Sequence, residues 1–335
     1  MSDRHIRLGY LDEVLAALFP APARGQRQYT LLPHRLLPRR LVPRAPHHRL
    51  LGRPVRVPVG DDNIEGHLCR VLDRDVRVIV RVRPARRANR KPVLEVHDRA
   101  GLAAFVKIGD RPRVRELVRH EADTLRLLAT LATEVVVPPR VLHHGVWHGM
   151  DVLVLTALPV PFPHRAPAPE LLAAAIGEIS TLGARARRRR ASEPASASGP
   201  TSASGPACES PACHTPSWEE WSWHGDFSPW NVAPGPGGRL LVWDWERFAT
   251  GVPLGFDALH HFFHRVLRWA PPYRAAELCL ARAARLLAPF GVPAEQARDT
   301  ASRYLVALAD RHRRDGHEPL GPPTRWLGPL LEVPC

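Results

Sequence analysis

Lysine is almost absent from this sequence. Of the 47 basic side chains only two, Lys91 and Lys107, are lysines, so a lysine at any position is a rare choice. The net charge of +14 is compatible with a polyanionic partner, but the arginines are spread along nearly the whole chain. We therefore interpret the charge first as a bias toward arginine, with polyanion binding as the alternative, and we expect no nucleic-acid partner.

Long hydrophobic runs and a cysteine framework are also missing. The longest apolar stretch, residues 152–163, is interrupted by Thr156 and three prolines and falls short of the roughly 18 residues of a membrane-spanning helix. The N-terminal residues mix charged with apolar positions, unlike a signal peptide, and the five cysteines are scattered and odd in number. These absences lead us to expect a cytoplasmic protein without a membrane-spanning segment.

The remaining composition is that of an ordinary globular chain with an excess of proline. Hydrophobic residues make up 44% and charged residues 24% of 335 positions, a length that suggests two domains or lobes. Residues 1–54, rich in proline, arginine and leucine, are predicted to form an N-terminal extension with one short helix near residues 10–19. The two lobes are predicted over residues 55–157 and 158–335.

The first lobe is predicted to contain strands followed by a helix. Alternating apolar residues and short, turn-rich connections favour antiparallel strands at residues 76–82, 92–97 and 103–108, and two further strands are predicted at residues 135–142 and 152–158. A helix is predicted over residues 112–131, and its apolar stripe includes the position of Glu121. A carboxylate on a buried face needs a partner, because leaving it unpaired costs several kcal/mol.

The second lobe is predicted to be mainly helical. A helix over residues 170–187 ends in arginines, and residues 191–217 that follow are almost entirely Ala, Ser, Pro, Gly and Thr. Such a segment cannot bury enough apolar area to offset its ordering entropy, so we predict a disordered insertion. It is either a tolerated surface excursion or a cover for the substrate site. Beyond it we predict a strand at residues 240–245 and helices near residues 256–269, 273–289 and 294–314.

The most informative segment is H-G-D-F-S-P-W-N at residues 224–231, which places Asp226 and Asn231 five residues apart in a turn-rich loop. An apolar strand then ends at Asp244, thirteen residues after the asparagine. This pattern resembles the catalytic core of the aminoglycoside phosphotransferase and choline kinase family, which are relatives of the protein kinases. In that family the loop is H-G-D-x-x-x-x-N, and the strand ends in an aspartate followed by an aromatic residue.

The resemblance implies a two-lobed, protein-kinase-like α+β fold, with a small antiparallel sheet in one lobe, helices in the other and ATP between them. It also implies ATP and Mg²⁺ as cofactors. Asp226 would accept the proton of a substrate hydroxyl, and Asn231 and Asp244 would supply the oxygen ligands that Mg²⁺ prefers. Lys107, at the end of the third predicted strand, would hold the phosphates. Glu121 would pair with Lys107, which gives the carboxylate on the apolar stripe its partner.

One segment departs from the family pattern. Protein kinases cover the phosphates with a glycine-rich loop, whereas residues 83–90 at the corresponding turn contain no glycine. The arginines there either contact phosphates or form a solvated tip. Lys91, which follows, is expected to be a solvated charge at the edge of a strand.

Other conspicuous residues receive structural interpretations. Asp257 is expected to cap a helix or to support the site from behind, without touching substrate. Glu246 is expected to be structural, with contact to a cationic or polyhydroxyl substrate as the alternative. The H-H-F-F-H segment at residues 260–264 has two imidazoles at a spacing that can hold zinc, but no H-E-x-x-H accompanies it. We therefore expect structural histidines.

The sequence as a whole predicts an ATP- and Mg²⁺-dependent phosphotransferase that transfers the γ-phosphate to a hydroxyl of a small molecule, with an aminoglycoside-, choline- or sugar-like acceptor. The alternative is a nucleotide-binding pseudokinase with a scaffolding or regulatory role. The glycine-free segment favours the alternative, and the complete set of Asp226, Asn231 and Asp244 opposes it. Protein-kinase activity is the weakest interpretation, because the chain has no D-F-G or A-P-E element.

Overall fold

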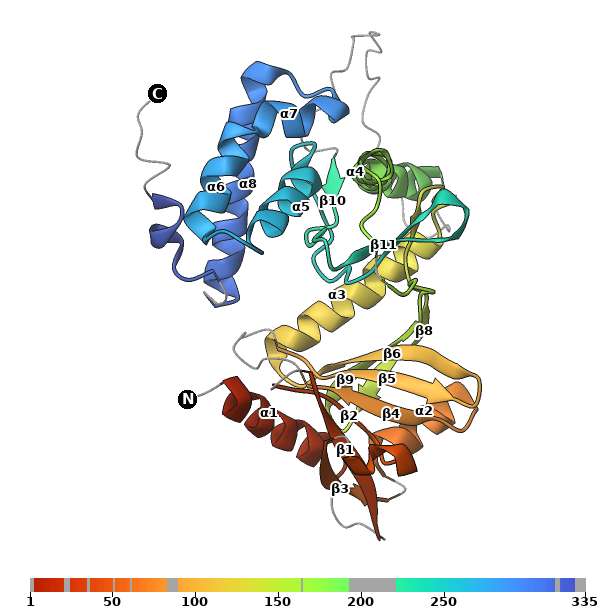
Figure 1. Cartoon of the computed structure of the whole chain (residues 1–335). Coiled ribbons are helices and arrows are strands. Elements are labelled where there is room, and N and C mark those ends of the chain that lie inside the picture. The colour runs from red at the N-terminus through yellow and green to blue at the C-terminus, as the bar shows by residue number, and fades with distance from the viewer. Residues whose placement is uncertain are drawn as a thin grey trace.

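The computed structural model describes residues 3–20, 25–34, 37–50, 52–60, 62–82, 90–163, 165–192, 221–316 and 320–328. Within these residues a lobe built on a sheet and a lobe built from helices meet along helix α3 (Pro112–Ala129), which lies between them in Figure 1. Nearly all of the predicted insertion at residues 191–217, and all but the last residue of the glycine-free segment at residues 83–90, lie outside the described residues.

The first lobe is an eight-stranded sheet with the strand order β3-β1-β2-β4-β5-β6-β9-β8. Every neighbouring pair in it is antiparallel. The strands are β1 (Gly25–His34), β2 (Leu37–Pro43), β3 (Arg53–Val59), β4 (Arg77–Arg81), β5 (Val93–Asp98), β6 (Gly101–Gly109), β8 (Val141–Trp147) and β9 (Met150–Thr156). In β4 the buried side chains of Val78 and Val80 alternate with more exposed neighbours, which is the pattern that predicted this strand.

The sheet extends beyond the part predicted from residues 76–108. Strand β2 pairs with β1 and with β4, with Leu41 opposite Val80, so β1 and β2 share one sheet with the rest of the lobe. Helix α1 (Asp3–Leu18) buries Leu11, Val14 and Leu18 in the same apolar cluster as Leu41. Residues 1–54 therefore supply a helix and strands to the sheet lobe. A further helix, α2 (Ile64–Leu72), precedes β4.

Helix α3 carries the apolar stripe that its sequence predicts. The five apolar residues of the stripe are all buried: Val114, Leu117, Val118, Leu125 and Leu128. All of them except Leu117 share a cluster with Leu153 of β9 and with Ile179 and Leu182 of helix α4 (Pro169–Ser192). Each fully buried leucine or valine contributes roughly 1.5–3 kcal/mol relative to exposure, so this cluster holds α3 firmly between the two lobes.

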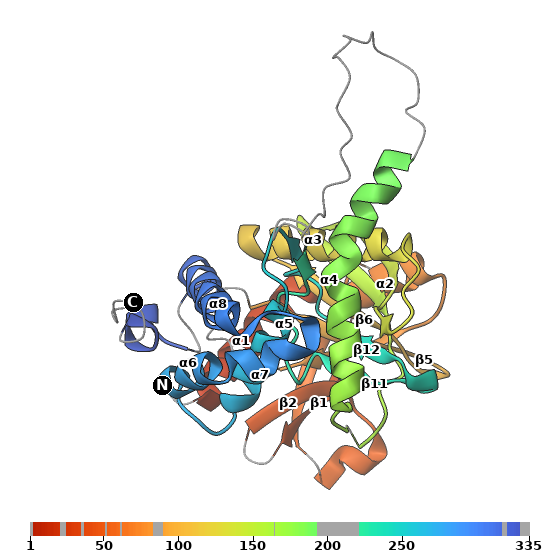
Figure 2. The same cartoon turned by 90° about the horizontal axis from the view of Figure 1, so that it is seen from above.

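The second lobe is mainly helical and contains α4, α5 (Phe256–Val266), α6 (Pro272–Ala281), α7 (Ala283–Leu287) and α8 (Ala294–Arg314). Figure 2 shows α4 as a long helix that crosses in front of α3. Two small sheets complete the lobe: β10 (Ser222–Trp223) with β13 (Ala249–Thr250), and β11 (Val232–Pro234) with β12 (Leu240–Val242) and β7 (Val136–Val137). In the part of the chain that the structure describes, short 3-10 helices lie at Pro46–Leu50, between β2 and β3 of the sheet lobe, and at Pro236–Gly238, Ala288–Phe290 and Pro323–Arg325 of the helical lobe.

The predicted fold class is confirmed: the chain is α+β, with an antiparallel sheet lobe and a mainly helical lobe. Among the described residues, no helix combines the length and the apolar character needed to cross a bilayer.

Candidate active site

Lys107 and Glu121 form a buried ion pair between the sheet and helix α3. In β6, Lys107 lies opposite Val93 of β5 and Leu153 of β9, so its backbone is fixed from both sides. Its Nζ lies 2.6 and 2.5 Å from the two carboxylate oxygens of Glu121. Lys107 is 8% exposed and Glu121 0%. The carboxylate on the apolar stripe of α3 therefore has the partner that the sequence predicts.

Asp244 reaches the same ammonium from the helical lobe. It follows β12, and its φ of +75° lies in the left-handed region that non-glycine residues rarely adopt. Its Oδ1 lies 2.6 Å from Nζ of Lys107. Burial alone would lower the pKa of Lys107, but the Asp244 and Glu121 carboxylates outweigh it and raise that pKa. The side chain of Lys107 is therefore a fixed positive charge where the two lobes meet.

Three carboxylates in this region have the chemistry of a divalent-cation site. One oxygen from each of Glu121, Asp244 and Glu246 lies within 4.8 Å of the other two. Mg²⁺ is a hard cation that prefers such oxygen ligands. The residues present therefore fit the cation that the family resemblance implies, with Asp244 as the most exposed of the three.

Asp226 lies in the loop between β10 and β11, with its side chain 28% exposed. Gly225 before it has a φ of +80°, and a Cβ there would lie 2.1 Å from the carbonyl oxygen of Arg247, so only glycine fits. A turn follows, in which the N–H of Ser228 donates to the carbonyl of Asp226 at 2.7 Å. This turn brings Asn231 back toward Asp226.

Asn231 is buried and holds Asp226 from the far side of the turn. Its Nδ2 donates to the carbonyl oxygen of Asp226 at 2.9 Å and to the carboxylate Oδ2 at 3.0 Å. The backbone carbonyl of Asn231 accepts the N–H of Trp243 at 3.1 Å. This hydrogen bond connects the loop to the segment that ends in Asp244. With Nδ2 engaged in this way, Oδ1 is the side-chain atom of Asn231 that is suited to a cation.

Asp257 supports the loop from beneath. Its carboxylate accepts the backbone N–H groups of His224 at 2.7 Å and Gly225 at 3.3 Å. Burial raises the pKa of Asp257 to about 7, although the two N–H donors oppose the shift. Gly255 occupies the N-cap position of α5, so the structure favours support of the site over helix capping for Asp257.

His224, the first residue of the motif, is buried and neutral. Burial lowers its pKa to about 4. Its Nδ1 accepts the backbone N–H of Asp226 at 3.1 Å, which orients the loop at the residue that the motif predicts to be reactive. The neutral imidazole of His224 therefore helps to fix the conformation of the loop by accepting this hydrogen bond.

One histidine of the H-H-F-F-H segment contacts Asp226 directly. His260, fully buried in α5, places Nε2 3.1 Å from Oδ1 of Asp226 and Nδ1 3.1 Å from the hydroxyl of Tyr304. Burial lowers the pKa of His260 well below 6.5, so the ring is neutral. The Tyr304 hydroxyl then donates to Nδ1, and Nε2–H donates to Asp226. Sequence reasoning missed this contact, although His260 is one helical turn after Asp257 and therefore on the same face of α5.

The sequence-based expectation for Lys91 is wrong. Its side chain is only 9% exposed, forms an ion pair with Glu246 and lies 3.9 Å from Oδ1 of Asp244. Lys91 is therefore part of the site and is not a solvated edge charge. The two lysines of the chain both approach the carboxylate of Asp244. The rarity of lysine in the sequence could have indicated that Lys91 belongs to the site. Glu246 is correspondingly a buried partner of Lys91.

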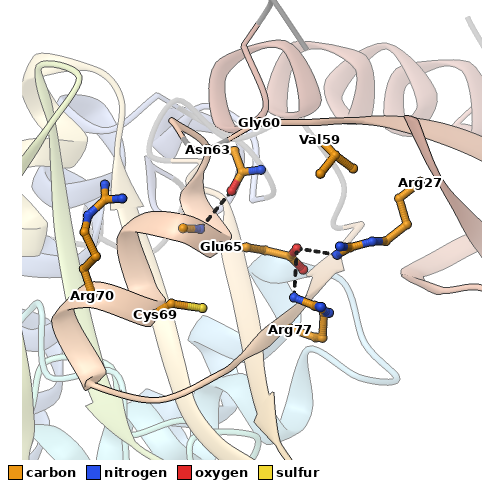
Figure 3. A pocket seen from close by; sticks show the side chains of 9 residues that line it. Arg27, Val59, Gly60, Asn63, Glu65, Cys69, Arg70 and Arg77 are labelled. Carbon is orange, nitrogen blue, oxygen red and sulfur yellow. Dashed lines mark hydrogen bonds and ion pairs between the residues drawn. The ribbon is translucent and has the colours of Figure 1, made fainter. Parts of the chain in front are cut away.

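A hollow of about 390 Å³ lies elsewhere, on the sheet lobe between β1, α2 and β4. Figure 3 shows Glu65 at its centre, joined to Arg27 and Arg77, with N–O distances of 2.8 and 3.8 Å. Glu65 also accepts the hydroxyl of Tyr29 at 2.8 Å. Its charge is balanced by these neighbours, and none of the predicted site residues lines the hollow.

Comparison with known proteins returns matches only among solved structures. No family model and no curated protein matches this sequence. An aminoglycoside phosphotransferase from Streptomyces rimosus, in complex with ADP and streptomycin, is 14% identical with a TM-score of 0.38, over 64% of this chain and 87% of that chain. A fructosamine-3-kinase assigned in Haemophilus somnus is 13% identical with a TM-score of 0.35, over 72% of this chain and 96% of that chain.

A third similar structure is the amicoumacin kinase hAmiN in complex with AMP-PNP, Ca²⁺ and Ami, which is 13% identical with a TM-score of 0.34, over 70% of this chain and 76% of that chain. At such low identity these complexes do not define the acceptor of the present chain. Its own geometry pairs a lysine of the sheet with a glutamate of α3, and supplies Asp226 and Asp244 from the helical lobe. This is the two-lobed α+β architecture that the sequence predicts.

Proposed function

We propose that this protein is a phosphotransferase that uses ATP and Mg²⁺ to phosphorylate a hydroxyl of a small molecule. The observation that carries the proposal is the meeting of Lys107, Glu121 and Asp244 at one point, with Lys107 Nζ 2.5 Å from Oε2 of Glu121 and 2.6 Å from Oδ1 of Asp244. Phosphoryl transfer requires a fixed cation and carboxylate ligands at one place, because catalysis there depends on positioning and on neutralising phosphate charge.

Asp226 is suited to the role of general base. Its carboxylate is accessible, and hydrogen bonds from Asn231 and His260 fix both of its oxygens. A fixed carboxylate within reach of an acceptor hydroxyl can take the proton as the oxygen attacks phosphorus. Mg²⁺ held by Asp244 and Asn231 would supply charge neutralisation at the phosphates. Lys107 would then bind the phosphates, with Glu121 orienting its ammonium.

A thermal-shift measurement tests the nucleotide and metal parts of this proposal. A ligand that binds only the native state stabilises it by about 2.7 kcal/mol at 100 times its Kd. We expect ATP with MgCl₂ to raise the melting temperature of the wild-type protein, and Asp244→Ala to lose that rise. Asp310→Ala, which removes an exposed carboxylate of α8, is the matched control and should retain it. No rise at millimolar ATP in the wild type contradicts the proposal.

A nucleotide-binding pseudokinase is the second candidate, favoured by the absence of glycine from residues 83–90. The two candidates differ in turnover, because a pseudokinase binds nucleotide without consuming it. Nucleotide binding together with a rate of ADP formation that Asp226→Asn leaves unchanged would favour the second candidate. The small-molecule nature of the acceptor and the cytoplasmic location stay predictions from the sequence.

A further inference from the structure

Lys91 belongs to the same face of the sheet as Lys107. The β5–β6 ladder continues past Val93, because the N–H of Ile108 donates to the carbonyl of Pro92 at 3.1 Å. Val93 lies directly opposite Lys107, and residues two apart in an extended segment point to the same face. Lys91 therefore extends toward the helical lobe beside Lys107, where it contacts Glu246 and approaches Asp244.

Five described charged groups meet at this point, and their charges nearly balance. The two ammonium groups of Lys91 and Lys107 face the three carboxylates of Glu121, Asp244 and Glu246, so the five groups carry one net negative charge. A divalent cation held by Asp244, as in the proposed function, would give the cluster one net positive charge. A polyanion is then favoured nearby, and the two ammonium groups lose Asp244 as a partner, because the cation competes with them for its carboxylate.

We propose that Lys91 is a second phosphate-binding lysine, which exchanges Glu246 for the terminal phosphates when the metal–nucleotide complex binds. This inference rests on the proposed function. Lys91 directly follows residues 83–90, where no glycine is available to let the backbone approach phosphates closely. A lysine ammonium is a compact point charge with three donors, so it can serve as a phosphate ligand in place of such backbone contacts.

The simpler interpretation is that Lys91 and Glu246 form a permanent bridge between the lobes. The two interpretations differ in how the effect of Lys91 depends on the number of phosphates in the ligand. A bridge between the lobes affects the affinity for all of these ligands equally, because it acts through the relative placement of the lobes. A phosphate ligand acts on the triphosphate and has little effect on the nucleoside.

Calorimetric titration with adenosine, AMP, ADP and AMP-PNP in MgCl₂ tests the inference. A hydrogen bond to a charged group is worth about 10- to 150-fold in affinity. We expect Lys91→Met to weaken AMP-PNP binding by at least about tenfold and adenosine binding by less than about twofold. Lys91→Arg should restore most of the loss, because it keeps the charge and can keep the contact with Glu246. Arg99→Gln, which removes an exposed charge from the turn at the other end of the β5–β6 hairpin, should bind like the wild type.

The remaining outcomes overturn the inference. An equal loss for adenosine and AMP-PNP in Lys91→Met assigns Lys91 to the bridge. Unchanged AMP-PNP binding in a folded Lys91→Met protein removes this inference and leaves the proposed function intact. Absence of nucleotide binding by the wild-type protein contradicts both the inference on Lys91 and the proposed function. Melting curves without nucleotide establish that the variants fold, and Lys91→Gln replaces Lys91→Met if the methionine variant does not.

Discussion

The carboxylate of Asp244 lies 2.6 Å from the ammonium of Lys107, although 137 positions separate the two residues in the chain. One residue comes from the central part of the sheet and the other from the loop after β12 in the helical lobe. Their contact places a cluster of opposite charges where the lobes meet. The predictions below follow from this contact and from the hydrogen bonds that fix Asp226.

Replacing Lys107 with methionine should destabilise the protein strongly. The change leaves Glu121 fully buried without its cation and removes the ammonium that Asp244 contacts at 2.6 Å. Removing one member of a buried ion pair typically costs about 3–5 kcal/mol, because the remaining charge is uncompensated. Urea denaturation at neutral pH measures the loss. The double variant Lys107→Met/Glu121→Leu should recover part of it, since the buried charge is then absent. If the double variant is no more stable than the single variant, Glu121 does not depend on Lys107.

Tyr304→Phe should slow turnover without weakening nucleotide binding. The hydroxyl of Tyr304 fixes the tautomer of His260 that donates to Asp226, so its loss lets the imidazole proton move to Nδ1. We expect kcat to fall by about tenfold, as part of the 100- to 10,000-fold that a general base contributes. The KM for ATP should stay within about twofold. A fall in kcat together with a rise in the KM for ATP, or a fall in melting temperature alone, would indicate a purely structural hydroxyl.

Gly225→Ala should be far more damaging than the same change at Gly237. Both glycines have positive φ, +80° and +67°, so both substitutions incur the left-handed penalty of about 1–2 kcal/mol. At Gly225 the new Cβ would also lie 2.1 Å from the carbonyl oxygen of Arg247, whereas nothing lies within 4 Å at Gly237. We expect at least about 2 kcal/mol of additional destabilisation at Gly225 by denaturant titration. Equal costs for the two variants contradict the close approach.

Stability should fall as the pH drops from about 6.5 toward 4. Burial lowers the pKa of His224 and of His261 to about 4, and the pKa values of His260 and His264 are also lowered. A histidine whose folded-state pKa is depressed contributes stability that is complete above its unfolded value of about 6.5 and is lost below it. For a buried group such as His224 the loss at pH 5 is about 2 kcal/mol.

Asp257 opposes this trend. Its pKa is raised from 3.8 to about 7 in the folded protein. Its contribution to the free energy of unfolding is therefore complete below about pH 4 and is lost as the pH rises through 7. The four histidines together should outweigh this one carboxyl. Urea midpoints at pH 7.5, 6.0 and 5.0 measure the balance, and His224→Asn should flatten the slope. A stability that is constant or highest at pH 5 contradicts the neutral, buried state of these rings.

Local sequence patterns predicted the elements that carry their own periodicity. Helix α8 spans residues 294–314 as predicted, and α3 buries the predicted stripe because apolar residues at 3.6-residue spacing form one face of a helix, which packs against the core. Glu121 was identified as needing a partner because it interrupts that stripe. The ion pair with Lys107 then followed from the family pattern, since the spacing along the chain does not give the distance in space.

The strands of residues 25–43 could not be predicted from the same patterns, because prolines interrupt them. Pro33 and Pro38 face each other across β1 and β2 at a shift in register near the end of the hairpin. Proline is tolerated at such an irregular position, where the ladder loses little by lacking its N–H. Because prolines count as evidence against strands, the sequence predicts that this segment belongs to an N-terminal extension.

Lys91 and His260 were misinterpreted because their roles depend on long-range contacts. Lys91 is 155 positions from its partner Glu246, and His260 is 34 positions from Asp226. Nothing near either residue in the sequence distinguishes a site residue from a surface lysine or a core histidine. The packing of the lobes and the placement of α5 under the loop decide both cases.

The central claim, transfer of the γ-phosphate with Asp226 as the base, is tested most directly by ADP formation. The wild-type protein and Asp226→Asn would be assayed with ATP and MgCl₂ against a panel of small hydroxyl compounds, with AMP-PNP affinity measured for both. We predict acceptor-dependent ADP formation by the wild type and a rate at least about 100-fold lower in Asp226→Asn, with equal AMP-PNP affinity. Equal rates in the two proteins, or nucleotide binding without acceptor-dependent ADP formation, would contradict the account.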